Sequence, residues 1–277
     1  MFLGRAAELP FTSGDYNVIV KVLKDTDPSE EKKQNFDIEA ALLANLVHPN
    51  VVRMMAVCIK TPPLSLVFES SEYGCLEEYL QDCDPNEFAR KGKKAALARD
   101  SFTELANVDR LSIAKQVSSG MQYLTEKGYI HQELRARNCL VFKDLQVKVA
   151  NLGLRWANPE QNFFVMEPSE KKHFPVRWLP PEVILYGEYS ESTDIWSYGV
   201  LVWEVFSDGR LPYTSINDND VVSYVRGHNV LPRPKPCPPH VYEVLKSCWE
   251  MVPAERPNFS SLHETMTSLH AGVAVWH

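Results

Sequence analysis

The segment HQELRARN, His131 to Asn138, places a carboxylate and a side-chain amide in one short loop. Glu133 can accept a proton as a general base, and the amide oxygen of Asn138 can ligate a metal ion. Far upstream, Lys21 in VIVK supplies a cation, and Glu39 in FDIEAALL supplies a carboxylate that can pair with it. A proton acceptor, a metal ligand and a fixed cation are the groups that phosphoryl transfer requires.

The apolar pattern predicts that a mixed α/β part and then a mainly helical part position these residues. NVIVKVLK (17–24) is short and β-branched, which is typical of a strand, and two further strands are expected in HPNVVRMMAVC and LSLVFE. Residues 29–46 have a broad apolar face and a serine cap, which indicates a helix. Residues 107–128 form a long amphipathic pattern that ends at a glycine, and 192–209 are apolar nearly all round. The boundary between the two parts is expected near residues 70–75.

The length, net charge and cysteine content limit the class of protein. A chain of 277 residues can form one large domain or two lobes, and its net charge of −7 argues against general affinity for nucleic acid. The six cysteines are scattered without metal-site spacing, which indicates reduced core residues and an intracellular compartment. There is no apolar run of about 18 residues. We therefore expect any membrane attachment to come through a transmembrane segment outside this chain.

A series of motifs in the right order resembles the protein kinase superfamily over nearly the whole chain. The matching segments are VIVK, FDIEAALL, HPNVVRMMAVC, VFESSEYGCL, HQELRARN, NLG, PPE, DIWSYGVLVWEVFSDGRLPY and CWEMVPAERPNF. Arg137, FPVRWLPPE and the CW…RP ending are similar to tyrosine kinases, and VRWLPPE to those of receptors. The resemblance implies an α+β, bilobal fold in one domain over 1–277. Its β-rich N-lobe would cover 1–70, starting after the glycine-rich loop, and its mainly helical C-lobe 71–277.

The resemblance also assigns roles to numbered positions. The implied nucleotide-binding residues are Lys21, Glu39, Phe68, Glu69, Ser71 and Leu140, with Phe68 as the gatekeeper. Glu133 stands at the position of the catalytic base and Gln132 at that of an arginine, while Asn138 and Asn151 stand at the metal-ligand positions. Asp194 is expected to anchor the backbone of the catalytic loop, and Glu182 to pair with Arg256.

Two of these positions depart from the family pattern, which has aspartate at both. Glu133 moves its carboxylate outward by one carbon–carbon bond, about 1.5 Å, and a displacement of about 1 Å can lower a rate on the order of 100-fold. Asn151 offers a neutral amide where Mg²⁺ prefers a carboxylate. The loss of charge is expected to outweigh the shift of Glu133. The sequence therefore predicts no likely cofactor, with weak or absent ATP binding and doubtful Mg²⁺ binding.

The segment that regulates such kinases departs as well. Receptor kinases of this type carry adjacent tyrosines there, whereas this chain has QNFFVM, with Phe163 and Phe164. A phenyl ring has no hydroxyl to phosphorylate, so the arginine that Gln132 replaces would have no phosphate to pair with. We expect the segment to lie over the cleft, held by apolar contacts.

Three functions are compatible with these residues. The first is a pseudokinase, not an enzyme: the intracellular domain of a receptor that acts as a scaffold or allosteric partner for signalling proteins or active kinases at the cytoplasmic side of the plasma membrane. It looks most like the Wnt-linked receptors of the protein tyrosine kinase 7 and off-track class, with ROR and neurotrophin-receptor kinases as neighbours. The second is a weak ATP-dependent protein tyrosine kinase. The third is a metal-free nucleotide binder.

Overall fold

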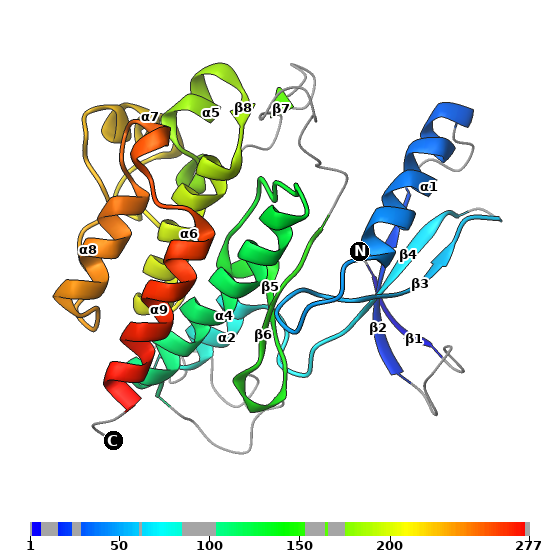
Figure 1. Cartoon of the computed structure of the whole chain (residues 1–277), viewed down its shortest axis with the longest axis horizontal. Helices are drawn as coiled ribbons and strands as arrows, with labels where there is room; N and C mark the ends of the chain where they lie inside the picture. Colours follow the sequence, from blue (N-terminus) through cyan, green and yellow to red (C-terminus); the bar gives the residue numbers. More distant parts are fainter. Residues whose placement is uncertain are drawn as a thin grey trace.

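The computed structural model describes residues 2–6, 16–23, 29–60, 63–84, 104–152, 164–165 and 175–274. A strand-rich small lobe and a larger helical lobe lie side by side (Figure 1). This confirms the expected α+β architecture. Within these ranges, no helix combines the length and apolar character needed to cross a membrane.

The small lobe is an antiparallel sheet of four strands with one helix. Its elements are β1 (Phe2–Ala6), β2 (Tyr16–Val22), α1 (Glu30–Ala44), β3 (Met54–Cys58) and β4 (Ser65–Glu69), and the strand order is β1-β2-β4-β3. The Ser29 hydroxyl accepts a hydrogen bond from the backbone N–H of Lys32 and so caps α1 as expected. The strand expected in HPNVVRMMAVC (48–58) begins only at Met54, and a register shift between Met54 and Ala56 interrupts its pairing with β4.

The large lobe is built around one buried helix. Its helices are α2 (Leu76–Asp82), α4 (Asn107–Glu126), α5 (Pro181–Tyr186), α6 (Glu191–Phe206), α7 (Asp218–Arg226), α8 (Pro239–Cys248) and α9 (Phe259–Ala274). Every residue of α6 from Thr193 to Phe206 is buried, as its all-round apolar pattern predicts. Gly128, which follows α4, has a φ of 72° and stops the helix in the left-handed region.

Short elements carry the loops of the site. The hairpin β5 (Cys139–Val141) and β6 (Val147–Val149) lies between the helices of the large lobe and the sheet of the small lobe (Figure 1). Single 3₁₀ turns cover Ala136–Asn138, Lys143–Leu145, Val176–Trp178 and Pro253–Glu255. The strand β7 (Phe164–Val165) pairs with β8 (Glu188–Tyr189). The turns Ala136–Asn138 and Val176–Trp178 lie within the segments HQELRARN and PVRWLPPE.

The turn before β3 is fixed to the large lobe, although it belongs to the sequence of the small one. The backbone N–H of Val52 donates to the carbonyl of Val149 at 2.8 Å, and that of Val149 donates to the carbonyl of Asn50 at 2.9 Å. The side-chain amide of Asn50 also donates to the carbonyl of Val147. The two lobes therefore meet through a hydrogen-bonded segment next to the cleft.

Candidate active site

Two buried carboxylates of α6 hold the loop HQELRARN. Asp194 accepts hydrogen bonds from the backbone N–H groups of His131, at 2.6 Å, and Gln132, at 2.8 Å. This confirms the anchoring role expected for Asp194. Gln132 itself is 2% exposed, with a φ of 68°, so the two bonds hold its backbone in the left-handed region.

Glu204 is the second anchor, and the sequence analysis missed it. Its Oε2 accepts hydrogen bonds from the backbone N–H of Ala136, at 3.0 Å, and from the indole N–H of Trp178, at 2.9 Å. Burial raises the pKa of Glu204 to about 8, although the two N–H donors act to lower it. The signal was present in the sequence, because Glu204 is the one charged residue between Ile195 and Phe206, which are otherwise mainly apolar.

The structure brings together the three residues of the expected base and metal positions. The side-chain amide of Asn151 donates to Oε2 of Glu133 at 3.1 Å, and the side-chain amide of Asn138 donates to the carbonyl of Glu133 at 2.7 Å. Asn151 has a φ of 59°, a conformation that asparagine tolerates better than most residues. The carboxylate of Glu133 is therefore oriented by the amide of the other substituted position.

The ion pair expected between Lys21 and Glu39 is present. Nζ of Lys21, on β2, lies 3.3 Å from Oε1 of Glu39, on α1, and donates to the carbonyl of Leu152 at 3.2 Å. The Lys21 side chain is 33% exposed and that of Glu39 is 12% exposed. The lysine thus joins the sheet, the helix and Leu152, the residue that follows Asn151.

A cavity of about 210 Å³ lies between the lobes at these residues. Its lining is Ile19, Val52, Phe68, Arg137, Asn138, Leu140, Ala150, Asn151 and Leu152. Apolar side chains and the two amides therefore share one cavity, which is a lining that suits a ligand with an apolar ring and a polar end. Phe68 and Leu140 belong to this lining, as the resemblance implies, whereas Lys21, Glu39, Glu69 and Ser71 do not.

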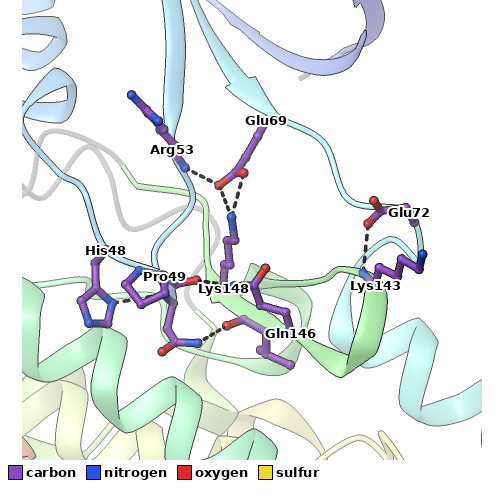
Figure 2. Close-up of polar contacts among 10 residues, drawn as sticks. His48, Pro49, Arg53, Glu69, Glu72, Lys143, Gln146 and Lys148 are labelled. Carbon is purple, nitrogen blue, oxygen red and sulfur yellow. Dashed lines mark hydrogen bonds and ion pairs between the residues drawn. The ribbon is translucent and has the colours of Figure 1, made fainter. Parts of the chain in front are cut away.

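Glu69 is engaged by other residues of the protein (Figure 2). Its carboxylate accepts hydrogen bonds from Nζ of Lys148, at 2.9 and 2.8 Å, and from the backbone N–H of Arg53, at 2.7 Å. The hydroxyl of Ser71 donates to the carbonyl of Gly74 at 3.1 Å. Both side chains therefore have partners within the chain, and neither lines the cavity.

Two further expectations concern the large lobe. The guanidinium of Arg256 contacts the carboxylate of Glu182 through two bonds, at 2.6 and 3.1 Å, which confirms that ion pair. Phe164 pairs in register with Tyr189 through β7 and β8. Phe163 and Gly153 lie outside the described residues, as does most of the segment that was expected to cover the cleft.

The family follows from comparison with known proteins. Residues 2–266 match the family described as protein tyrosine and serine/threonine kinase. The chain belongs to this family. It is 33% identical to the human NT-3 growth factor receptor over an alignment of 288 residues, which covers all of this chain and 34% of the receptor. It is also 34% identical to the BDNF/NT-3 growth factors receptor of Gallus gallus over 253 residues, which cover 91% of this chain and 30% of the receptor.

This kinase domain thus spans about a third of the length of these relatives. It is a protein tyrosine kinase domain homologous to the neurotrophin receptors. Membership of the family corrects two expectations, namely that the chain is not an enzyme and that it has no likely cofactor. The match and the relatives point instead to a kinase, and such kinases use ATP and Mg²⁺. The expectations failed because they gave the departures at Glu133, Asn151 and the regulatory segment more weight than the motifs that the chain shares with the family.

Proposed function

We propose that this chain is the ATP-dependent protein tyrosine kinase domain of a receptor, slowed by the reduced charge of its metal site. The observation that carries the proposal is that Lys21, paired with Glu39, reaches the carbonyl of Leu152, directly after the residue Asn151 that contacts Glu133. We take the chain as a single domain, with the N-lobe over 1–70, starting after the glycine-rich loop, and the C-lobe over 71–277.

In this proposal the residues of the chain position the substrates and move one proton. Lys21, oriented by Glu39, holds the phosphates of ATP. Glu133 accepts the proton of the substrate hydroxyl, and the hydrogen bond from Asn151 limits the freedom of its longer side chain. Phe68 and Leu140 contact the base, and the backbone at Glu69 and Ser71 provides polar partners. Gln132 keeps the shape of the loop through its bond to Asp194.

The metal site fits Mg²⁺ with a reduced charge. Asn138 and Asn151 would hold the ion through amide oxygens together with ATP phosphates, and one carboxylate, that of Glu133, lies beside them. When bound, the ion neutralises charge on the phosphates. Among the described residues, no group of three or more His, Cys, Asp or Glu side chains is arranged to hold a metal. The donor set therefore supports slow transfer rather than fast transfer.

The names of the relatives support the proposed setting. Both are growth factor receptors, and we infer that this domain works at the cytoplasmic side of the plasma membrane, where it contacts other signalling proteins. In this proposal, a transmembrane segment outside this chain attaches the domain to the membrane. A scaffold role and a link to Wnt signalling stay predictions, and neither depends on the loss of catalysis.

Thermal unfolding in the presence of ATP tests nucleotide binding. ATP at 100 times its dissociation constant stabilises a domain by about 2.7 kcal/mol, which raises the melting temperature by a few degrees at this size. We expect a rise that increases with Mg²⁺ and is lost in Lys21→Met. A rise that is independent of metal would favour the metal-free nucleotide binder, and no rise under any condition would contradict the proposal.

A further inference from the structure

A second cavity, of about 560 Å³, lies in the large lobe where the end of α6 meets the loop between α7 and α8. Trp203, Phe206 and Leu231 give it an apolar wall, and prolines of the segment PRPKPCPP form its edge. It shares no lining residue with the cavity of the active site. A ligand in this second cavity would therefore leave the cleft free.

The rim of the second cavity is positively charged, although the chain as a whole carries a net charge of −7. Arg210, Arg233 and Lys235 line it, and the one lining carboxylate, Asp208, is paired with Arg110 at 2.7 Å. The Arg210 side chain is 67% exposed and reaches its acidic partner Asp84 only at 3.9 Å. The cations of this rim are thus available to an anionic ligand from solution.

The guanidinium of Arg233 is held in place, because its Nη1 donates to the carbonyl of Cys237 at 2.6 Å. A guanidinium that is already fixed loses little freedom when a carboxylate binds to its other N–H groups. The rim therefore combines one positioned cation, Arg233, with two exposed ones.

The end of α6 at this cavity would repel an anion if its carbonyl groups were free. They are not free, because the carbonyl of Val205 accepts from Arg110, and that of Glu204 accepts from the backbone N–H groups of Ser207 and Gly209. The repulsion from the helix end is correspondingly reduced.

Ser207 gives a second and independent sign of a ligand. It lines the cavity, is 7% exposed, and its hydroxyl has no hydrogen-bond partner within the described part of the chain. An unpaired buried hydroxyl costs free energy, and a polar ligand atom would remove this cost. Rotation about a single bond allows the hydroxyl to meet an acceptor oxygen in the cavity.

We propose that this cavity binds an acidic, extended segment of a partner protein. An apolar side chain of that segment packs against Trp203, Pro232 and Pro236, and its carboxylates contact Arg210, Arg233 and Lys235. A membrane fits less well, since three cations around a concave site fall short of the clusters of about four to eight that bind anionic lipid.

Fluorescence anisotropy with a labelled peptide of nine residues, four glutamates on each side of a leucine, tests the proposal. We expect Arg210→Glu/Lys235→Glu to weaken binding by about tenfold, and the matched double variant Lys127→Glu/Lys246→Glu to bind within about twofold of the wild type. Ser207→Ala should weaken binding by about threefold through the lost hydrogen bond while the melting temperature stays equal or rises.

Several results would overturn this proposal. One is no binding of the peptide by the wild type, and another is equal binding of a peptide with glutamine in place of every glutamate. Equal losses in the two double variants would show that net charge, not this cavity, attracts the peptide. Binding to phosphatidylserine vesicles without binding to the peptide would assign the rim to a membrane.

Discussion

At the scale of the residue, the substitutions at positions 151 and 133 fit each other, because the amide of Asn151 supplies a hydrogen bond to the carboxylate of Glu133. The amide of Asn151 donates to the carboxylate of Glu133 at 3.1 Å. An aspartate at position 151 would place a second carboxylate beside the first, and two such groups repel unless a cation lies between them. The present pair is therefore stable without a metal, at the cost of weaker attraction for one.

This pair predicts the behaviour of Asn151→Asp. Without divalent metal, the variant should lose about 1 kcal/mol of unfolding free energy through the lost hydrogen bond. With ATP present, it should respond to lower Mg²⁺ concentrations than the wild type. Thermal unfolding over a Mg²⁺ titration measures both effects. Asn107→Asp, which adds the same charge at the exposed start of α4, should leave the Mg²⁺ response unchanged, and an equal response in both variants would refute the account.

Glu204 predicts a pH dependence of stability. Burial raises its pKa in the folded chain to about 8 from an ordinary value of 4.5, so the folded state binds more protons between these values. Its contribution to the free energy of unfolding is therefore greatest in acid and falls as pH rises from about 4.5 to 8. Urea unfolding from pH 5 to 9 should show this fall in the wild type and in Glu264→Gln, but a flatter profile in Glu204→Gln. Stability profiles that fall equally with pH in the wild type and in Glu204→Gln would contradict this account of Glu204.

At the scale of the element, the sequence predicts the helix ends that are set by neighbouring residues. The ends of α1, α4 and α6 lie within three residues of the expected ones, because Ser29, Gly128 and the apolar runs act locally. The apolar run CLVF after HQELRARN is strand-like and contains β5, whereas the strands β6 to β8 were not predicted, since segments of two or three residues carry no readable period. The roles of Asp194, Glu182 and Phe68 came from the family pattern rather than from periodicity.

Contacts between distant segments could not be predicted. Glu204 and Ala136 are 68 residues apart, and Lys148 and Glu69 are 79 apart. Nothing in the local pattern of either segment indicates its partner, because the fold alone brings them together. The same limit applies to the hydrogen bond between Asn151 and Glu133. This bond shows that the two substituted residues interact, which the sequence alone does not indicate.

Close packing of α4 gives a prediction for its glycine. A Cβ atom at Gly120 would lie 2.4 Å from the carbonyl oxygen of Asn50, whereas one at Gly272 in α9 would meet nothing within 4 Å. Alanine in a helix normally stabilises by about 1 kcal/mol relative to glycine. We expect Gly272→Ala to follow this rule and Gly120→Ala to lose about 2 kcal/mol or more through strain. Chemical denaturation measures both, and a stabilised Gly120→Ala would show that the approach is not tight.

At the scale of the whole molecule, the ion pair between Glu69 and Lys148 connects the end of the small-lobe sheet to β6 of the large lobe (Figure 2). The two side chains are only 20% and 13% exposed. Such a partly buried pair couples more strongly than an exposed one. It limits how far the lobes can separate at the cleft.

A double-mutant cycle measures this coupling. With Glu69→Gln and Lys148→Met, we expect a coupling energy of about 1–2 kcal/mol in unfolding free energy. The exposed pair of Glu30 and Lys33, at 2.7 Å, should give about 0.5 kcal/mol or less. Equal coupling energies in the two pairs would mean that the ion pair between Glu69 and Lys148 stabilises the fold no more than a surface contact does.

The most direct test of the central claim is phosphate transfer from ATP with Mg²⁺ to a glutamate–tyrosine copolymer. The account predicts slow transfer by the wild type, none by Lys21→Met, and a rate raised on the order of tenfold or more in Asn151→Asp, because a carboxylate restores charge at the metal position. Transfer by the wild type that is no greater than that of Lys21→Met would contradict the account.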